Sequence, residues 1–103
     1  VQKTLALVHK GLNVAEIAQK RGIKEGTVWS HFANLIEYGQ LAVWKIMSKK
    51  KIVKILQNVK HYFESLTEIR MRLSLRYFTF NEIACVLAHV KMKEKIKDKL
   101  GEN

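Results

Sequence analysis

The strongest constraint on the fold lies in residues 13–39, which read NVAEIAQKRGIKEGTVWSHFANLIEYG. Asn13 is a favourable helix N-cap, and Glu16 stands three residues later, at the spacing of a capping box. Gly22 interrupts the apolar periodicity and can adopt the left-handed conformation that ends a helix. Apolar residues then recur at i, i+4, i+7 and i+8 of a longer helix over residues 24–38: Val28, Phe32, Leu35 and Ile36. The pattern predicts a helix-turn-helix, two helices joined by a tight turn.

An ordinary pair of amphipathic helices in a small bundle is the alternative interpretation of this stretch. Against it, the cap, the turn glycine and both apolar stripes agree with one another. Helix-turn-helix units also serve as protein-docking or purely structural elements. The pattern therefore predicts the geometry more firmly than it predicts contact with DNA.

The remaining sequence favours helices as well, because the chain of 103 residues contains no proline and its apolar periodicity is helical almost throughout. We expect an all-α fold, with a tri-helical helix-turn-helix core and a second small helical lobe. Residues 1–47 would form the first lobe, residues 48–92 would form the second lobe packed on the first, and residues 93–103 would form a basic C-terminal tail.

Two further segments complete the predicted first lobe. A helix over residues 1–10 braces the helix-turn-helix and turns Leu5 and Val8 inward. The apolar stretch over residues 40–47 is interpreted as a linker, pinned to the core by two side chains, Trp44 and Ile46.

The predicted second lobe begins with two helices of unequal length. Ser48 caps a long helix over residues 49–65, and Thr67 caps a short helix over residues 68–73. A final helix then starts at a second capping box. The residues of that box are Thr79 and Glu82. From residue 91 onward lysines alternate with other residues, which predicts a fraying, solvated tail.

The charge of the chain favours a polyanionic partner, most simply nucleic acid, since the formal net charge is +10 at pH 7 and the pI is near 9.9. Residues 1–40 hold five Lys/Arg and three Glu, whereas residues 41–103 hold fourteen Lys/Arg and six acidic residues. Most of the excess charge is therefore expected outside the helix-turn-helix. A solvated basic surface without a specific partner is the alternative.

Other features of composition narrow the setting. No apolar run approaches the roughly 20 residues that cross a bilayer, so no membrane partner is expected. The single Cys excludes an internal disulfide and suits a reducing compartment such as the cytoplasm. The first residue is Val rather than Met, which suggests a fragment of a longer protein.

The predicted outward face of the helix over residues 24–38 is small and polar. Ser30 and Asn34 can hydrogen-bond base edges, and Thr27 can bind a phosphate. Trp29 fits three roles equally well: packing between lobes, stacking on an unpaired base, or marking a partner surface. The complete set of predicted DNA contacts is Lys20, Arg21, Lys24, Thr27, Trp29, Ser30, His31, Asn34, Lys50 and Lys54.

The charges around these contacts are unevenly placed. Glu25 and Glu37 on the candidate recognition helix repel phosphate, which favours weak or non-specific binding by that helix alone. Lys50 and Lys54 lie on the exposed side of the following helix, near a first turn that is rich in lysine although cations oppose the helix dipole there. This arrangement suggests a functional basic patch, and a solvated face is the commoner explanation.

The sequence lacks the usual marks of catalysis. It has no glycine-rich phosphate loop, no Walker signature and no nucleophile elbow. Cys85 and His89 are spaced i, i+4 on one helix face, but no further Cys or suitably spaced His completes a metal site. We expect no cofactor, no metal ion and no enzymatic activity in this chain.

Several short motifs are distributed over residues 4–92. They are G-x-x-x-x-E-I-A at 11–18, R-G-[IL]-x-x-x-T-[VI] at 21–28, the pair His31-Phe32, G-x-L at 39–41 and the segment FTFNEI at 78–83. Together they resemble the helix-turn-helix domain at the C-terminus of RecQ-type and related bacterial DNA helicases, where the last segment corresponds to a closing Y-x-E-I-x-x-x-L-A helix. The first half alone is also similar to the helix-turn-helices of response regulators and sigma factors, and the later segment favours the helicase domain.

The resemblance implies a non-catalytic accessory module that binds duplex or forked DNA, largely through phosphates, beside a helicase motor in the same chain. Its setting would be the bacterial cytoplasm and nucleoid, in DNA repair or recombination. Two alternatives stay open: a protein-docking module of the helicase, with Trp29 on an exposed apolar patch, and a helix-turn-helix of the transcription-regulator type.

Overall fold

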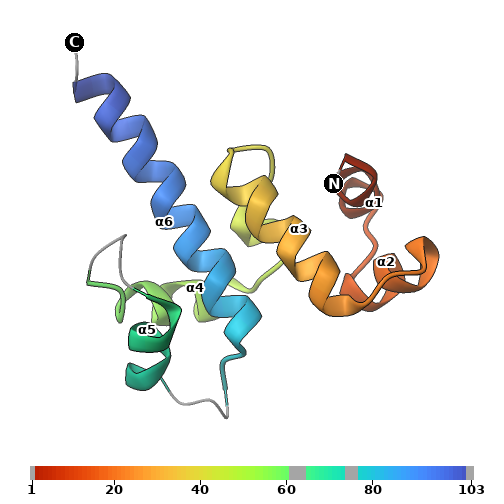
Figure 1. Ribbon diagram of the computed structural model, residues 1–103, viewed down its shortest axis with the longest axis horizontal. Helices are drawn as coiled ribbons and strands as arrows, with labels where there is room; N and C mark the ends of the chain where they lie inside the picture. Colours follow the sequence, from red (N-terminus) through yellow and green to blue (C-terminus); the bar gives the residue numbers. More distant parts are fainter. Residues whose placement is uncertain (1, 61–64, 74–76, 102–103) are drawn as a thin grey trace.

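The last helix of the chain forms the spine on which the other elements pack. The computed structural model describes residues 2–60, 65–73 and 77–101. The helices in these ranges are α1 (Gln2–His9), α2 (Val14–Arg21), α3 (Glu25–Glu37), the 3-10 helix η1 (Val43–Lys45), α4 (Lys49–Leu56), α5 (Leu66–Arg72) and α6 (Phe80–Gly101). α6 packs most extensively on α3, and it also contacts α4, α5 and η1. Figure 1 shows α6 running diagonally, with α1 to α3 on one side and α4 and α5 on the other. The described residues contain no strand, so the all-α prediction is confirmed.

The predicted helix-turn-helix is present as α2 and α3. The backbone N–H of Glu16 donates to Asn13 Oδ1 and the backbone N–H of Asn13 donates to Glu16 Oε1, each at 2.9 Å, which completes the capping box. Gly22 ends α2 in the left-handed conformation, at φ 65° and ψ 37°. The N–H of Ile23 then reaches back to the Ala18 carbonyl at 3.0 Å. Cap, turn and second helix all agree with the sequence pattern.

The turn glycine gives the first prediction. Gly22→Ala should lower the free energy of unfolding by about 1–2 kcal/mol, because an L side chain is strained at positive φ. Nothing lies within 4 Å of the added Cβ, so the loss would come from the backbone alone. Gly26, inside α3, has the same open space and an ordinary φ, and Gly26→Ala should raise stability by about 0.5 kcal/mol. Urea denaturation of both variants checks the opposite signs.

The inward face of α1 differs from the predicted one. Thr4 and Leu7 are buried, whereas Leu5 and Val8 are only partly buried against the core. The prediction followed apolar residues alone and therefore passed over a threonine. Thr4 is buried because its hydroxyl bonds to α2 and α3, as described below.

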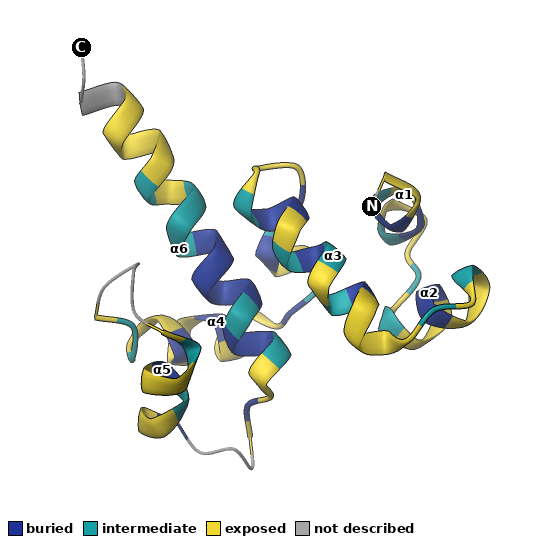
Figure 2. Ribbon diagram, in the orientation of Figure 1, coloured by how far each residue is buried: buried dark blue, intermediate teal, exposed yellow. Residues whose placement is uncertain are grey.

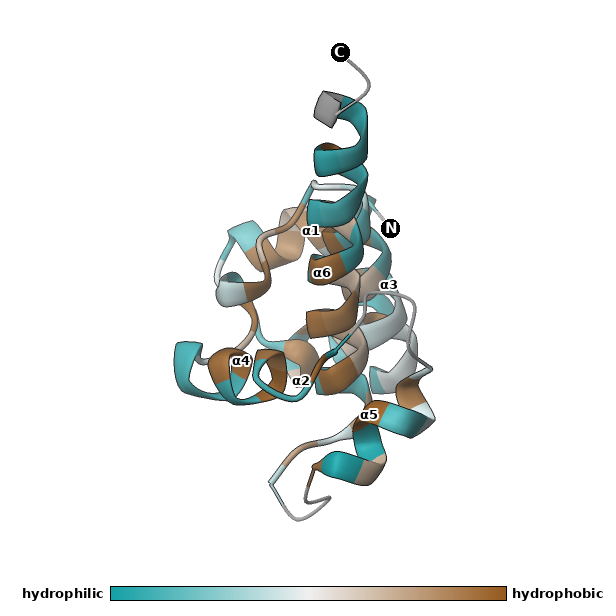
Figure 3. Ribbon diagram, turned by 90° about the vertical axis from the view of Figure 1, so that its left-hand side faces the viewer, coloured by the Kyte–Doolittle hydropathy of each residue, from teal (hydrophilic) through white to brown (hydrophobic). Residues whose placement is uncertain are grey.

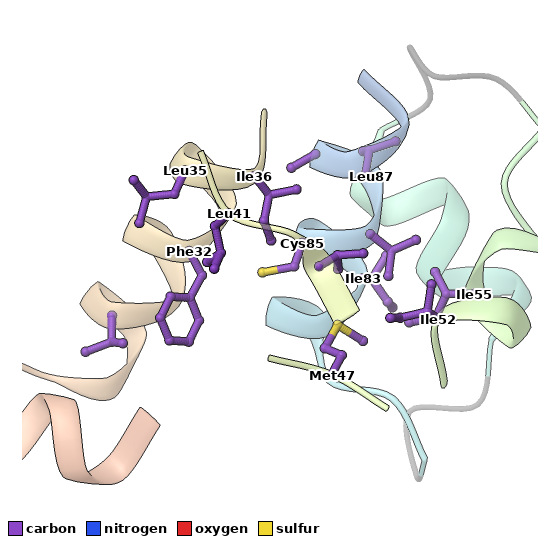
Figure 4. Packing of buried hydrophobic residues seen from close by; sticks show 14 of the residues in the cluster. Phe32, Leu35, Ile36, Leu41, Met47, Ile52, Ile55, Ile83, Cys85 and Leu87 are labelled. Carbon is purple, nitrogen blue, oxygen red and sulfur yellow. The ribbon is translucent and has the colours of Figure 1, made fainter. Parts of the chain in front are cut away.

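The core draws side chains from both halves of the chain. Ile36 of α3 points toward α6, and Ile83 of α6 lies near Ile52 and Ile55 of α4 (Figure 4). The predicted box at the start of α6 is confirmed by hydrogen bonds between the residues Thr79 and Glu82.

The C-terminal part of α6 corrects the expectation of a fraying tail. The helix continues to Gly101, and its lysines from Lys93 to Lys99 are exposed. Figure 2 shows the helix buried along its first half and exposed along its second, and Figure 3 shows the same change from apolar to hydrophilic. The solvated character was therefore predicted, and the helical order was not.

α4 is shorter than the predicted helix over residues 49–65. Ser48 caps it as expected, with the Lys51 N–H donating to its hydroxyl at 3.3 Å. The helix nevertheless ends at Leu56, where Asn58 Nδ2 bonds back to the Lys54 carbonyl at 3.0 Å. Residues 61–64 of the predicted helix lie outside the described residues.

The short α5 helix begins two residues earlier than predicted. Its cap is Ser65, whose hydroxyl accepts from the Glu68 N–H at 3.2 Å, and not Thr67. Both residues are hydroxyl side chains, so the sequence offered two equivalent caps. An Arg72 guanidinium nitrogen donates to the Asn58 carbonyl at 2.8 Å and ties α5 to the end of α4.

The stretch over residues 40–47 is held to the core by Ile46, as predicted, and by three side chains that were not predicted. Leu41, Val43 and Met47 are buried. Trp44 is 62% exposed, and its ring forms a T-shaped pair with the buried His89 ring, with centroids 5.8 Å apart. Ile46 is partly buried against the core, as expected. The short η1 helix in this stretch turns Val43 inward and Trp44 outward.

Candidate nucleic-acid interface

The outer face of α3 is small, polar and open to solvent. Thr27, Ser30 and Asn34 are all exposed on it, as the helical period predicted. The Ser30 hydroxyl donates to the Gly26 carbonyl at 3.1 Å, which leaves its oxygen free to accept. Lys24 is exposed at the N-cap of α3. This face can offer hydrogen bonds to a ligand, but the cation of this helix, Lys24, stands at its N-terminal end.

Trp29 lies beside this face rather than on it. Its ring meets Phe32 edge to face, with centroids 5.6 Å apart and planes at 80°. The side chain is partly buried against the core and lines a hollow with Leu12 and Ile46. Of the three roles considered for Trp29, packing is the one that this geometry supports.

Arg21 and His31 use their polar atoms inside the protein. An Arg21 guanidinium nitrogen donates to Thr4 Oγ1 at 2.6 Å and lies 3.2 Å from His31 Nδ1. The Thr4 hydroxyl is 2.9 Å from the same Nδ1. Because Arg21 only donates, Nδ1 must accept, so the imidazole is neutral. This network joins α1, α2 and α3. Arg21 and His31, two of the predicted DNA contacts, therefore contribute to the packing of these three helices.

Two histidines give the fold a dependence on pH. Burial and the nearby Arg21 lower the pKa of His31, and burial and Lys93 lower the pKa of His89. The unfolded chain protonates its histidines near the ordinary value of 6.5. The unfolded state therefore binds more protons just below that pH, and stability falls as the pH drops through it.

The expected result is a free energy of unfolding that is constant above about pH 7 and declines toward pH 5. His31→Gln should flatten part of that decline, because it removes one of the two titrating groups. Urea midpoints at pH 7.5 and 5.5 check this for both proteins. A wild-type midpoint that rises on acidification would contradict the neutral His31 in the network.

A basic groove lies between α1 and α2. Its lining is Lys3, Ala6, Leu7, Lys10, Lys20 and Arg21, without an acidic side chain. Arg21 also reaches His31 of α3, which stands one helical turn from Thr27 and from Asn34, so the Arg21 end of this α1–α2 groove lies near the outer face of α3. Lys20 was a predicted contact, whereas Lys3 and Lys10 were missed. Their spacing of seven residues, which places both on one face of α1, was the available signal.

The other side of α3 borders α6. Asn34 and Lys91 line a shallow groove together with Ala84 and Leu87. Beyond it, Lys95 Nζ pairs with Glu37 Oε2 at 2.9 Å, and this contact raises the pKa of Lys95. The pair offsets the Glu37 charge that was expected to repel phosphate. Lys91 adds a cation beside Asn34 that sequence reasoning had not selected.

Lys50 and Lys54 lie at a different place. They line a groove with Tyr77 and Phe78, and this groove is separate from the one that Asn34 and Lys91 line. Their neighbour Lys51 pairs with Glu82 at 2.8 Å. That contact, acting against burial, lowers the pKa of the Glu82 carboxyl. The structure therefore brings Thr27, Ser30 and Asn34 together and leaves Lys50 and Lys54 apart from them.

The Cys85–His89 pair is part of the packing. Cys85 is buried, and burial together with Glu82 raises the pKa of its thiol to about 12. The described part of the chain holds no group of three or more His, Cys, Asp or Glu side chains placed to bind a metal ion. Among the helices of the described ranges, none has the length and apolar character needed to cross a bilayer.

Comparison with known proteins agrees with this geometry. No curated protein and no solved structure matches the chain significantly. A family model described as a helix-turn-helix domain matches residues 1–87. That range contains α1, the capped α2, the glycine turn and α3, and it reaches into the buried half of α6. The chain therefore belongs to this family of helix-turn-helix domains.

Proposed function

We propose that this chain is a non-catalytic DNA-binding module. The observation that supports this most is the exposed polar face of α3, with cations on both sides. The α1–α2 groove supplies Lys3, Lys10 and Lys20 on one side, and Lys91 stands beside Asn34 on the other. A helix with a polar face and flanking lysines suits a duplex, whose phosphates flank a major groove about 12 Å wide.

In this proposal the two kinds of contact have separate tasks. The lysines bind phosphates, which fixes the position of the module and supplies most of the affinity. Ser30 and Asn34 meet base edges, where an Asn amide can bond to adenine. Because these two side chains are few and uncharged, sequence preference should be weak.

We further propose that the module serves an ATP-dependent DNA helicase, positioning DNA in the bacterial cytoplasm for a motor in the same chain. The support is the resemblance of its motifs to the C-terminal helix-turn-helix domain of RecQ-type helicases. Sequencing the coding region upstream of Val1 tests this part. A helicase motor there is expected, whereas a sensor or ligand-binding domain would favour a transcription regulator.

A matched pair of variants tests DNA binding by α3. Asn34→Asp and Gln57→Glu each turn an exposed amide into a carboxylate, one on α3 and one at the end of α4. Asn34→Asp should weaken binding of a labelled duplex by about tenfold, since it adds a charge that repels phosphate and replaces a base-edge donor. Gln57→Glu should change it by less than about twofold. Fluorescence anisotropy at low salt measures both.

Three results would count against the proposal or redirect it. Absence of duplex binding at low salt would remove DNA as the partner. Equal losses in the two variants would mean that the whole surface binds by charge and that α3 has no special place. A strong sequence preference with a dimeric protein would favour a transcription regulator over a helicase module.

A further inference from the structure

A second surface of the molecule is apolar at its centre and basic at its rim. The groove beside α4 has a volume of about 710 Å³. Val53, Tyr77 and Phe78 form its apolar part, and the polar side chains along it are Lys50, Lys51, Lys54 and Gln57. Val53 is 43% exposed and Tyr77 is 65% exposed. We refer to these seven residues as the α4 groove.

The α4 groove has charges that the protein itself leaves unmatched. Lys51 is paired with Glu82, but neither Lys50 nor Lys54 forms an ion pair within the described residues. Lys50, Val53, Lys54 and Gln57 follow one face of α4, since they are spaced i, i+3, i+4 and i+7. Two turns of helix thus present Val53 between lysines, beside Tyr77 and Phe78.

We propose that the α4 groove binds an acidic amphipathic helix of a partner protein. The partner would place apolar side chains between Val53, Tyr77 and Phe78, and carboxylates opposite Lys50 and Lys54. This is the helix-in-groove mode, in which apolar anchors supply affinity and the rim charges select the partner. The surface is separate from the outer face of α3, so the module can hold DNA and a protein together.

The composition of the α4 groove favours a peptide over single-stranded nucleic acid. Bases need exposed aromatic rings to stack on, and Tyr77 is the one exposed ring here, because Phe78 is buried. Val53 offers no stacking surface. Gln57 is the single uncharged polar side chain that the groove offers to base edges. Apolar side chains of a peptide use the whole of this surface.

The test uses a designed probe and variants that leave the charge unchanged. The probe is a labelled peptide of about 14 residues, roughly four helical turns, with Leu at i, i+4 and i+7 and Glu on both flanks. Its controls are the same peptide with Lys in place of Glu, and one with the Leu residues scattered. Val53→Ser and Tyr77→Ser should each weaken the acidic probe by about tenfold, and the control peptides should not bind.

Met71→Ser is the matched control variant, because Met71 is 82% exposed on α5 and lies outside the groove lining. It should bind the acidic probe like the wild type. All three substitutions are at exposed positions, so circular dichroism should show unchanged helix content. No binding of the acidic probe, or equal effects of Val53→Ser and Met71→Ser, would overturn the proposal. Binding of a thymidine decamer that is lost in Tyr77→Ser, without peptide binding, would assign the groove to single strands instead.

The amide variants separate this inference from DNA binding. Gln57→Glu should weaken binding of the acidic probe and leave binding of the duplex unchanged. Asn34→Asp should weaken binding of the duplex and leave binding of the probe unchanged. If Gln57→Glu leaves binding of the acidic probe unchanged while Asn34→Asp weakens binding of the duplex, the α4 groove proposal is overturned. If Asn34→Asp leaves binding of the duplex unchanged while Gln57→Glu weakens binding of the acidic probe, the α3 interface is overturned.

Discussion

Phe32→Ala is expected to lower the free energy of unfolding by about 3–5 kcal/mol, the usual range for emptying a buried phenylalanine site. Phe32 is 1% exposed and belongs to the core cluster that also includes side chains of α6. Its removal also leaves the ring of Trp29 without its edge-to-face neighbour. The total free energy of unfolding of a domain of this size is about 5–15 kcal/mol. The variant should therefore be partly unfolded at 37 °C.

The matched control is Phe80→Ala, which deletes the same atoms at the start of α6. Phe80 is 40% exposed, and its ring faces Arg70 at 5.2 Å. Its loss should reduce stability by about 1 kcal/mol. Urea denaturation followed by circular dichroism measures both. If the two variants lose the same stability, α3 is not held by the core described above.

Duplex affinity is expected to fall by about five-hundredfold between 50 and 200 mM salt, if about five phosphates are neutralised. Five lysines flank the outer face of α3 or the adjoining groove, and each phosphate contact releases counterions. These lysines are Lys3, Lys10, Lys20, Lys24 and Lys91. Anisotropy titrations across this range of salt give the slope of log affinity against log salt.

Single substitutions locate the contributing charges. Lys20→Gln and Lys91→Gln should each reduce the magnitude of that slope by about 0.9. Lys54→Gln should leave it unchanged, because Lys54 lies in the α4 groove. A larger effect of Lys54→Gln than of Lys20→Gln would move the DNA interface to α4.

The parts of the fold that sequence predicted are those fixed by local interactions. Asn13 with Glu16, and Thr79 with Glu82, are neighbours in sequence, so their capping boxes follow from spacing alone. The end of α4 was not predictable in this way. The apolar stripe continues past Leu56. At the end of the helix the Asn58 side-chain amide donates to the Lys54 carbonyl, and Arg72 of α5 donates to the Asn58 backbone carbonyl.

The candidate interface likewise has features that the sequence predicts and features that depend on tertiary contacts. Exposure of Ser30 and Asn34 follows from the helical period, because Val28 and Phe32 fix the buried side. The hydrogen bond from Arg21 to Thr4 depends on how three helices cross. The apolar periodicity of the sequence does not specify that crossing. Lys91 reaches the side of Asn34 only because α6 returns to α3 from the far end of the sequence. Tertiary contacts therefore decided which cations flank the polar face.

The central claim is that DNA meets the outer face of α3, and amide chemical shifts of the labelled protein during a duplex titration at low salt test it most directly. The largest shifts are predicted for the amides of residues 24–34 and for Lys91, with small changes along α4. Shifts confined to the amides of α4, with those of residues 24–34 unmoved, would contradict the claim.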